Sequence, residues 1–293
     1  MLTASGGTTF GSASMHSTLL FERRFWAHVI ERRGLTFDAR FMPPAQRQSR
    51  SVVVYLLVEG EFVVREPTAA RFVAPACFVV DEEAYEGSSR RKRSLFFRAA
   101  GEPFVAIDLR VDRSVSTFVR TPEPRRVDLD VETWNGARQV LRAGDATSVC
   151  AAVRSLVTEL ERHGILRPGV AASIRDGDHR FARLWAAIAP AISRYHALPT
   201  LQELAVGSEL SLRHAAREVK AFLECFQVMG ANWRELTLRS RLKLAVLGLS
   251  ARDISVGEVA RGAGYGSSDA MARAFRDAGL PAPNAVQQAL RQL

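Results

Sequence analysis

The segment Thr200–Glu224, TLQELAVGSELSLRHAAREVKAFLE, decides the fold because a similar segment occurs a second time in the chain. Ser255–Asp277, SVGEVARGAGYGSSDAMARAFRD, begins 55 residues later. Each segment opens with a capping box, in which a Ser or Thr hydroxyl accepts a hydrogen bond from the amide three residues on, and a glutamate reaches back to the cap amide. A tight turn and a second helix follow in both. The repeat predicts two helix–turn–helix units.

The second helix of each unit is predicted to have one apolar face and one polar, basic face. Along Ser211–Glu224 the apolar positions are Leu212, Ala215, Val219, Phe222 and Leu223. Along Ser267–Ala278 they are Met271, Ala274, Phe275 and Ala278. The predicted DNA-binding residues are Ser211, Arg213, His214, Arg217, Lys220, Ser267, Ser268, Asp269, Arg273 and Arg276. A major groove accepts an α-helix and Arg binds guanine or phosphate well, so double-stranded DNA is the predicted partner.

A single helix is predicted to connect the two units. It runs from Gly230 to about Leu247 and would be roughly 27 Å long. Because the two units pack beside the ends of this helix, the distance between them exceeds the helix length. It then suits two major grooves about 34 Å apart on one face of DNA. Trp233 is predicted to be a core residue that clamps the units together.

Three motifs resemble the AraC/XylS family of transcriptional regulators. They are LSLRHAAREVK (Leu210–Lys220), GANWRELTLRSRLKLA (Gly230–Ala245) and GYGSSDAMARAFR (Gly264–Arg276), and the resemblance covers about Phe181–Pro283. The resemblance implies sequence-specific binding to promoter DNA, with contacts from Arg213, Arg217 and Arg273. It also favours an activator, whose partner would then be RNA polymerase.

The chain departs from the family pattern at five positions. Glu209 stands in the first turn where a Gly is usual, so that turn must tolerate a side chain. Ala215 is smaller than the usual apolar residue, and Glu218 puts an acid near the DNA-facing side. Leu280 and Val286 replace a usual Gly and a usual aromatic residue. These changes bear on the strength of DNA binding by the first reading helix more than on the existence of that helix.

The N-terminal part is predicted to be a β-sandwich or barrel. SVVVYLLV (Ser51–Val58), Glu59-Gly60 and EFVVR form a predicted hairpin, and Cys77–Val80, Ser94–Arg98 and Phe104–Val111 are further predicted strands. This order of domains resembles the cupin-like jelly-roll sensors of many family members. A small organic effector is therefore expected inside the barrel, near Tyr55, Phe62, Arg71, Phe78 and Phe97, with Arg71 or Arg98 available for a carboxylate.

Composition argues against catalysis and against a membrane protein. The six histidines all lie outside Thr36–Val111, and no P-loop, GxSxG or strand-borne GxGxxG occurs, so we expect no metal, no cofactor and no enzymatic activity. Three widely spaced cysteines favour the reducing cytoplasm. No apolar run approaches the ~20 residues of a membrane span. The net charge of +9 suits a polyanionic partner, although it is spread along the chain.

The predicted fold class is α+β multidomain, in four parts. Residues 1–34 are predicted to form a flexible extension and helix, with Met15 as an alternative start, and residues 35–120 the cupin-like barrel. Residues 121–177 are predicted to form a helical linker or dimerisation segment, and residues 178–293 the double helix–turn–helix domain. The apolar stripe of Asp145–His163 would either pair with a second chain in a homodimer or pack on the barrel. Two alternatives to effector control stay open: control by a partner protein, and a metal-free cupin enzyme fused to the DNA-binding domain.

Overall fold

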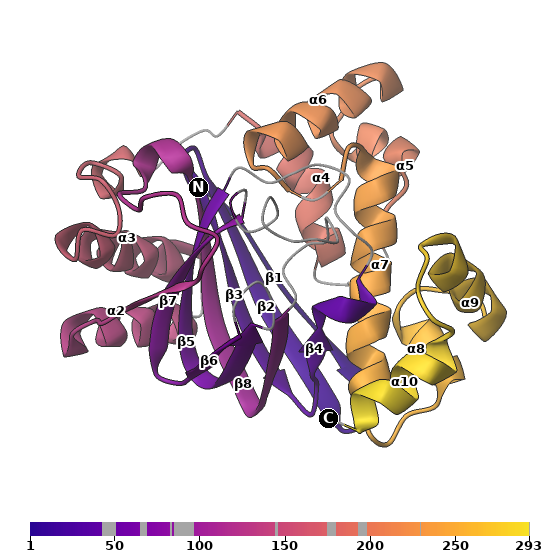
Figure 1. Cartoon of the computed structure of the whole chain (residues 1–293). Helices are drawn as coiled ribbons and strands as arrows, with labels where there is room; N and C mark the ends of the chain where they lie inside the picture. The colour runs from indigo at the N-terminus through magenta and orange to yellow at the C-terminus, as the bar shows by residue number, and fades with distance from the viewer. Residues whose placement is uncertain are drawn as a thin grey trace.

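The computed structural model describes residues 1–42, 51–64, 69–82, 84, 97–143, 146–174, 180–192, 198–228 and 230–292 of the chain. The N-terminal part is an antiparallel sheet that curls into a half-barrel, and the C-terminal part is helical (Figure 1). The fold class is therefore α+β, as predicted.

Nine strands make up the sheet in the described residues. They are β1 Leu2–Phe10, β2 Ala13–Glu22, β3 Phe25–Arg33, β4 Phe37–Asp38, β5 Ser51–Val64, β6 Ala70–Val73, β7 Ala76–Asp81, β8 Phe97–Asp112 and β9 Arg125–Val127. The order is β1-β2-β3-β8-β5-β7-β9, with β4 on β8 and β6 on β5. Short 3-10 helices follow β4, follow β8 and precede the C-terminal part, at Ala39–Phe41, Arg113–Val115 and Ala171–Ser173.

The prediction of a flexible extension and helix over residues 1–34 is wrong, because these residues form β1, β2 and β3. Strands β1 and β2 pair from Leu2↔Phe21 to Phe10↔Ala13, and β3 joins the sheet next to β8. Small residues such as Gly and Ser hide the alternation that marks a strand, yet Leu2, Ala4 and Phe10 all point to the buried side. Met15, the alternative start, lies within β2.

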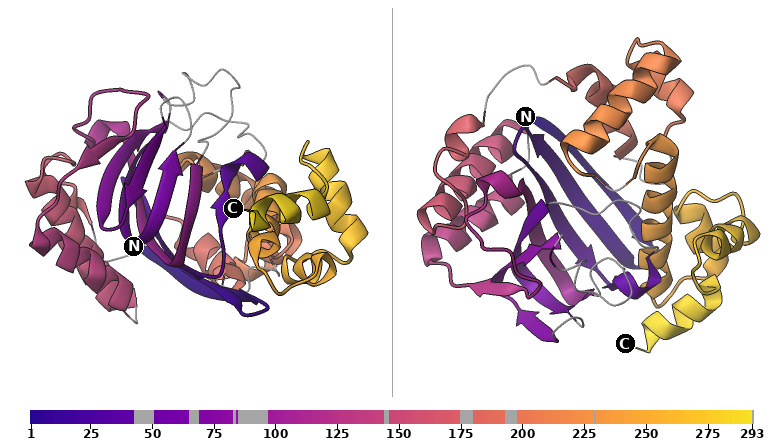
Figure 2. Two further views of the ribbon diagram at one scale, coloured as in Figure 1. Left: turned by 60° about the horizontal axis from the view of Figure 1, so that its bottom comes forward. Right: turned by 45° about the horizontal axis from the view of Figure 1, so that its top comes forward.

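The helices α2 (Val131–Arg142) and α3 (Ala146–Arg162) cover one face of the sheet (Figure 2). The α3 stripe is buried in a common core with the strands, at Val149, Val153, Leu156, Val157 and Leu160. Of the two predictions for this stripe, packing on the barrel of the same chain is the one the structure shows. The stripe is therefore occupied and does not supply a free surface for a homodimer.

The predicted linker Thr121–Arg126 is in part a strand, so the boundary placed at residue 120 is too early. Strand β9 pairs with β7 through Cys77↔Val127, Phe78↔Arg126 and Val79↔Arg125. Prolines on either side of Glu123 suggested a linker, but a proline outside a three-residue edge strand removes no ladder hydrogen bond.

Seven helices form the C-terminal part within the described residues. They are α4 Ala182–Ile192, α5 Leu201–Gly207, α6 Leu212–Cys225, α7 Trp233–Ser250, α8 Val256–Gly262, α9 Ser268–Asp277 and α10 Pro283–Arg291. Helices α5 and α6 form the first helix–turn–helix unit, and α8 and α9 form the second. Helix α7 connects the two units, and both units pack against the β1–β2 hairpin (Figure 1).

Candidate DNA-binding face and effector site

Hydrogen bonds at the helix starts set the local shape of both units. In the first unit the Glu203 amide donates to Thr200 Oγ1 over 3.2 Å, and the Thr200 amide donates to Glu203 Oε2 over 2.6 Å. Ser255 and Glu258 form the same pair in the second unit, with distances of 3.3 and 2.9 Å. The bonds to Thr200 and Ser255 lower the pKa of both glutamates. Both predicted capping boxes are therefore present.

The two turns have the same backbone shape although their sequences differ. Glu209 has φ of 55° and Gly264, at the matching position of the second unit, has φ of 79°. Both values lie in the left-handed region, which a side chain disfavours. The first turn thus accepts a side chain, at the expense of backbone strain that the second turn avoids.

The basic side chains of α6 and α9 point to solvent. Arg213, Arg217 and Lys220 are exposed on α6, and Arg273 and Arg276 are exposed on α9. Ser268 and Asp269 are exposed at the start of α9. The structure therefore leaves both predicted faces open to a large partner. DNA contact by these residues stays a prediction.

Three other predicted DNA-binding residues have contacts within their own helices. The Ser211 hydroxyl accepts from the His214 amide over 3.3 Å, and the Ser267 hydroxyl accepts from the Ala270 amide over 3.1 Å. Both hydroxyls are N-caps that keep their own proton available for a phosphate. The His214 ring lies 3.8 Å from the Glu218 carboxylate on the next turn of the same helix.

Two core predictions need correction. The sequence predicts Leu212 on the buried apolar stripe of α6, but its side chain is 48% exposed. Leu212 is the first residue of α6 and lies before the part of the helix that packs on α5. Trp233 is buried, as predicted, and its Nε1 donates to the Pro199 carbonyl over 2.6 Å. However, it packs in the core of the first unit, with Leu204 and Phe222, and not between the units.

The aromatic effector candidates are brought together but fill each other's space. Tyr55 stacks on Phe78 at 4.9 Å and contacts Phe62 at 5.0 Å between ring centroids, and all three are at most 3% exposed. The predicted Arg71 lies away from them, on Glu61, which also pairs with Arg98. The side chain of Phe97 lies outside the described residues. These residues stay effector candidates, without a described opening between them.

The structure places a group of charged side chains on the concave side of the half-barrel that the sequence analysis missed. His28 and Arg32 come from β3, Asp108 and Arg110 from β8, and Lys243 from α7 of the C-terminal part. His28 and Asp108 are direct neighbours across the two strands. Asp108 and Arg110, two residues apart in the apolar run FVAIDLRV, were the available signal, since that spacing puts both on one face of a strand.

Burial and mutual repulsion perturb these groups strongly. Burial lowers the pKa of Arg32 to about 10, against the opposing effect of the Asp108 carboxylate. Burial together with Arg32 and Arg110 lowers the pKa of Lys243 to about 8, against the opposing pull of Asp108. Burial raises the pKa of Asp108 to about 6, and burial and the same cations lower the pKa of His28. Such perturbed groups gather at functional sites more often than elsewhere.

Within the residues that the structure describes, several donors in and next to this group have no hydrogen-bond acceptor. Arg32 is 4% exposed and lies 4.2 Å above the Phe104 ring, and its Nε has no hydrogen-bond partner. The Nε of Arg110 and the indole Nε1 of Trp26 are also without partners, with the Arg110 guanidinium 5.1 Å from the Trp26 ring. Arg110 pairs with Glu82 through another nitrogen. Unpartnered buried donors are rare in proteins. Two of these donors, on Arg32 and Arg110, belong to the charged group.

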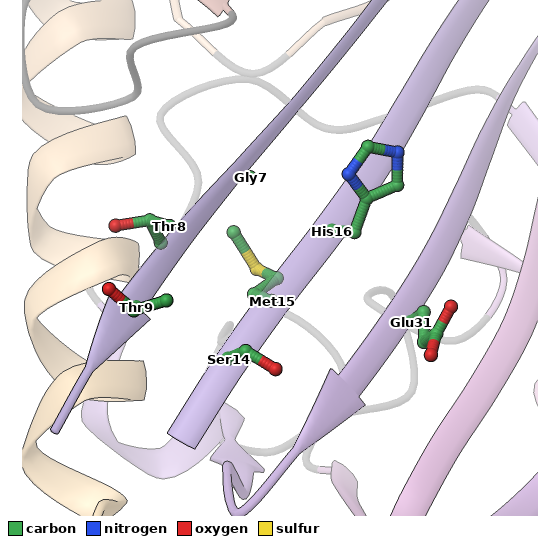
Figure 3. A pocket seen from close by; sticks show the side chains of 7 residues that line it. All are labelled: Gly7, Thr8, Thr9, Ser14, Met15, His16 and Glu31. Atoms are coloured by element: carbon green, nitrogen blue, oxygen red, sulfur yellow. The ribbon is translucent and has the colours of Figure 1, made fainter. Parts of the chain in front are cut away.

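A separate surface hollow of about 380 Å³ lies on the β1–β3 part of the sheet (Figure 3). Its lining is Gly7, Thr8, Thr9, Ser14, Met15, His16 and Glu31. Across the part of the chain that the structure describes, no three His, Cys, Asp or Glu residues gather into a metal-binding group. Among the same residues, no helix is both long and apolar enough to cross a membrane.

A β half-barrel followed by two helix–turn–helix units on one connecting helix is the arrangement that the resemblance of the sequence motifs led us to expect. No family model and no curated protein matches the chain. Among solved structures it is similar to ToxT from Vibrio cholerae with an unsaturated fatty acid bound, at 10% identity and a TM-score of 0.38, covering 94% of this chain and 99% of that one. It is also similar to the AraC-like transcriptional activator CuxR, at 9% identity and a TM-score of 0.30, covering 73% and 75%.

Proposed function

We propose that the chain is a sequence-specific, DNA-binding transcription regulator that acts in the cytoplasm. The observation that carries this proposal is the repeat of one helix–turn–helix design with exposed Arg at matching positions. Arg217 on α6 and Arg273 on α9 project from helices whose opposite faces carry the buried residues, among them Val219 on α6 and Phe275 on α9. Contacts of Arg and Lys with phosphate would supply much of the affinity, and a few base contacts would supply specificity.

Selection of bound fragments from randomised duplex DNA by the full-length protein tests this proposal. Enrichment of two boxes about one helical turn apart would support reading by both units. No enrichment, together with weak binding that vanishes as the salt concentration rises, would contradict it. Whether the regulator activates, with RNA polymerase as partner, would then be measured by transcription from a promoter that contains the selected site.

We further propose that the N-terminal part binds a small organic anion on the concave side of the half-barrel. Arg32, Arg110 and Lys243 supply three cations there against the carboxylates of Asp108 and Glu82, and the Nε atoms of Arg32 and Arg110 have no hydrogen-bond partner among the described residues. A carboxylate would satisfy these donors and return the lowered pKa of Lys243 toward its usual value. The aromatic residues Tyr55, Phe62 and Phe78, close to Arg110 on the same face, would contact the apolar part of such a ligand.

A thermal-shift series with organic acids of increasing chain length, each paired with its methyl ester, tests the effector proposal. Acids that stabilise the wild-type protein but not the Arg32→Met variant, while their esters stabilise neither, would support it. If no acid stabilises the wild-type protein and a second protein co-purifies with it, control by a protein partner is favoured instead. Turnover by the N-terminal part is not expected.

A further inference from the structure

The β1–β2 hairpin contacts both helix–turn–helix units, each at a different end of the hairpin. Its open end, at Leu2 and Phe21, lies in the core of the first unit. Its turn end, at Phe10 and Ala13, lies in the core of the second unit. Helix α7 is the covalent link between the units, and the hairpin makes a second, non-covalent link (Figure 1).

The first end is anchored by an aromatic cluster. The Phe21 ring lies 5.1 Å from Phe222 and 4.9 Å from Phe226, which belong to or directly follow the recognition helix α6. It also lies 5.0 Å from Trp185 on α4. The Trp185 Nε1 donates to the Thr3 carbonyl over 2.8 Å, so the backbone of β1 is tied to the same helix.

The second end is anchored by one phenyl ring in a notch made of two glycines. Phe10 is 1% exposed, and its ring lies where side chains at Gly248 on α7 and Gly262 on α8 would be. A Cβ at these positions would be 2.7 and 2.9 Å from the ring. Beside it, the Ser12 amide donates to Asp253 Oδ2 over 2.9 Å, and this bond lowers the pKa of Asp253. The notch therefore admits a flat ring only because both helices lack a side chain there.

The lengths of the two links agree. Leu2 to Phe10 spans eight strand steps, or roughly 26 Å, and the 18 residues of α7 span roughly 27 Å. We propose that the β1–β2 hairpin is a strut that holds the two recognition helices at one separation and orientation, with Phe10 as the positioning residue of its second anchor. This inference rests on the proposed DNA binding. It makes the sheet part of the framework that positions the recognition helices, because the hairpin adds a second anchor for each unit to the packing of the units on α7.

The test compares spacing preferences of full-length variants on DNA. The probe is the duplex enriched by the wild-type protein, and two derivatives in which the segment between the boxes is longer or shorter by about two base pairs, which rotates one box by roughly 70°. Phe10→Ala should lose about tenfold in affinity at the selected spacing and much less on the derivatives, so that it no longer prefers one spacing.

Gly262→Ala, which displaces the Phe10 ring from the notch but leaves the phenyl side chain intact, should lose the spacing preference in the same way. Phe72→Ala, a buried phenyl in the half-barrel core away from both units, is the matched control and should keep the wild-type preference.

The outcomes separate this inference from the proposed function. If the wild-type protein enriches no duplex, the DNA-binding proposal fails and the strut fails with it. If the wild-type protein binds but the folded Phe10→Ala and Gly262→Ala variants keep its spacing preference, the strut alone is overturned. Tighter binding of these variants at every spacing would also overturn it, because the hairpin would then restrain the units and not position them. A selected site with a single box would do the same.

Discussion

The strained turn of the first helix–turn–helix unit yields a prediction with a built-in comparison. Glu209 and Gly264 occupy the same turn position with φ of 55° and 79°. A side chain in the left-handed region destabilises the folded state by about 1–2 kcal/mol. Replacing that residue by Gly removes this strain, but it also raises the conformational entropy of the unfolded chain, which offsets about 0.4–1 kcal/mol of the gain in stability. Glu209→Gly should therefore stabilise the protein by about 0.5–1 kcal/mol, and Gly264→Ala, to which the same two terms apply with opposite sign, should destabilise it by about 0.5–1 kcal/mol.

Equilibrium denaturation followed by far-ultraviolet circular dichroism measures both changes. For a chain of this size, 1 kcal/mol corresponds to a shift of the melting temperature of about 2–4 °C. Glu209→Ala is the matched control, because it removes the carboxylate but keeps the Cβ atom and the strain. The carboxylate itself contributes little, since its 3.4 Å ion pair with Arg183 is exposed on both sides. A Gly variant no more stable than the Ala variant would refute the strain argument.

Three further predictions concern binding, pH and packing. Arg217→Ala and Arg273→Ala should each weaken binding of the selected duplex by about 1–3 kcal/mol if a base contact is lost, as measured by fluorescence anisotropy at fixed salt; unchanged affinity in both would refute the assignment of the faces. The pKa of Lys243 is about 8 in the folded protein and 10.5 in the unfolded chain, so between these pH values the unfolded chain binds more protons than the folded protein. The free energy of unfolding should therefore rise with pH across that window, by at most about 3 kcal/mol. Lys243→Met should flatten that rise in denaturation curves, and an unchanged slope would contradict it. Leu160→Ala should destabilise the chain by about 2–5 kcal/mol without changing its oligomeric state in sedimentation, whereas dissociation of a dimer would reassign the α3 stripe.

The helix–turn–helix units could be predicted because their signals are local. The capping boxes at Thr200 and Ser255 join residues three apart, and the apolar stripes of α6 and α9 follow helical spacing. Leu212 shows the limit of that spacing rule. Its angle around the helix suits the stripe, but the rule does not register that the first turn of α6 extends past the core.

The charged group could not be predicted in the same way, because its members come from remote parts of the chain. Strands β1, β2 and β3 pair with their neighbours in the chain, and only β3 also pairs with β8, about 80 residues away at His28↔Asp108. The same pairing brings His28 beside Asp108. Lys243 joins them only through the docking of the C-terminal part, so no spacing in the sequence indicates that these side chains meet.

The proposed effector site and the proposed strut favour the same arrangement of the two parts. Arg32 belongs to the sheet and Lys243 to α7, so an anion that contacts both binds more tightly when the sheet and α7 are together. At a concentration 100 times its dissociation constant, such a ligand would stabilise that arrangement by up to about 2.7 kcal/mol. The hairpin fixes the recognition helices in the same arrangement, through Phe10 and Phe21. By thermodynamic reciprocity, DNA with the matching spacing must then raise the affinity for the anion by the factor with which the anion raises the affinity for DNA. Coupling between effector and operator thus requires no change of shape within either part, only the shared dependence of both ligands on one docked interface.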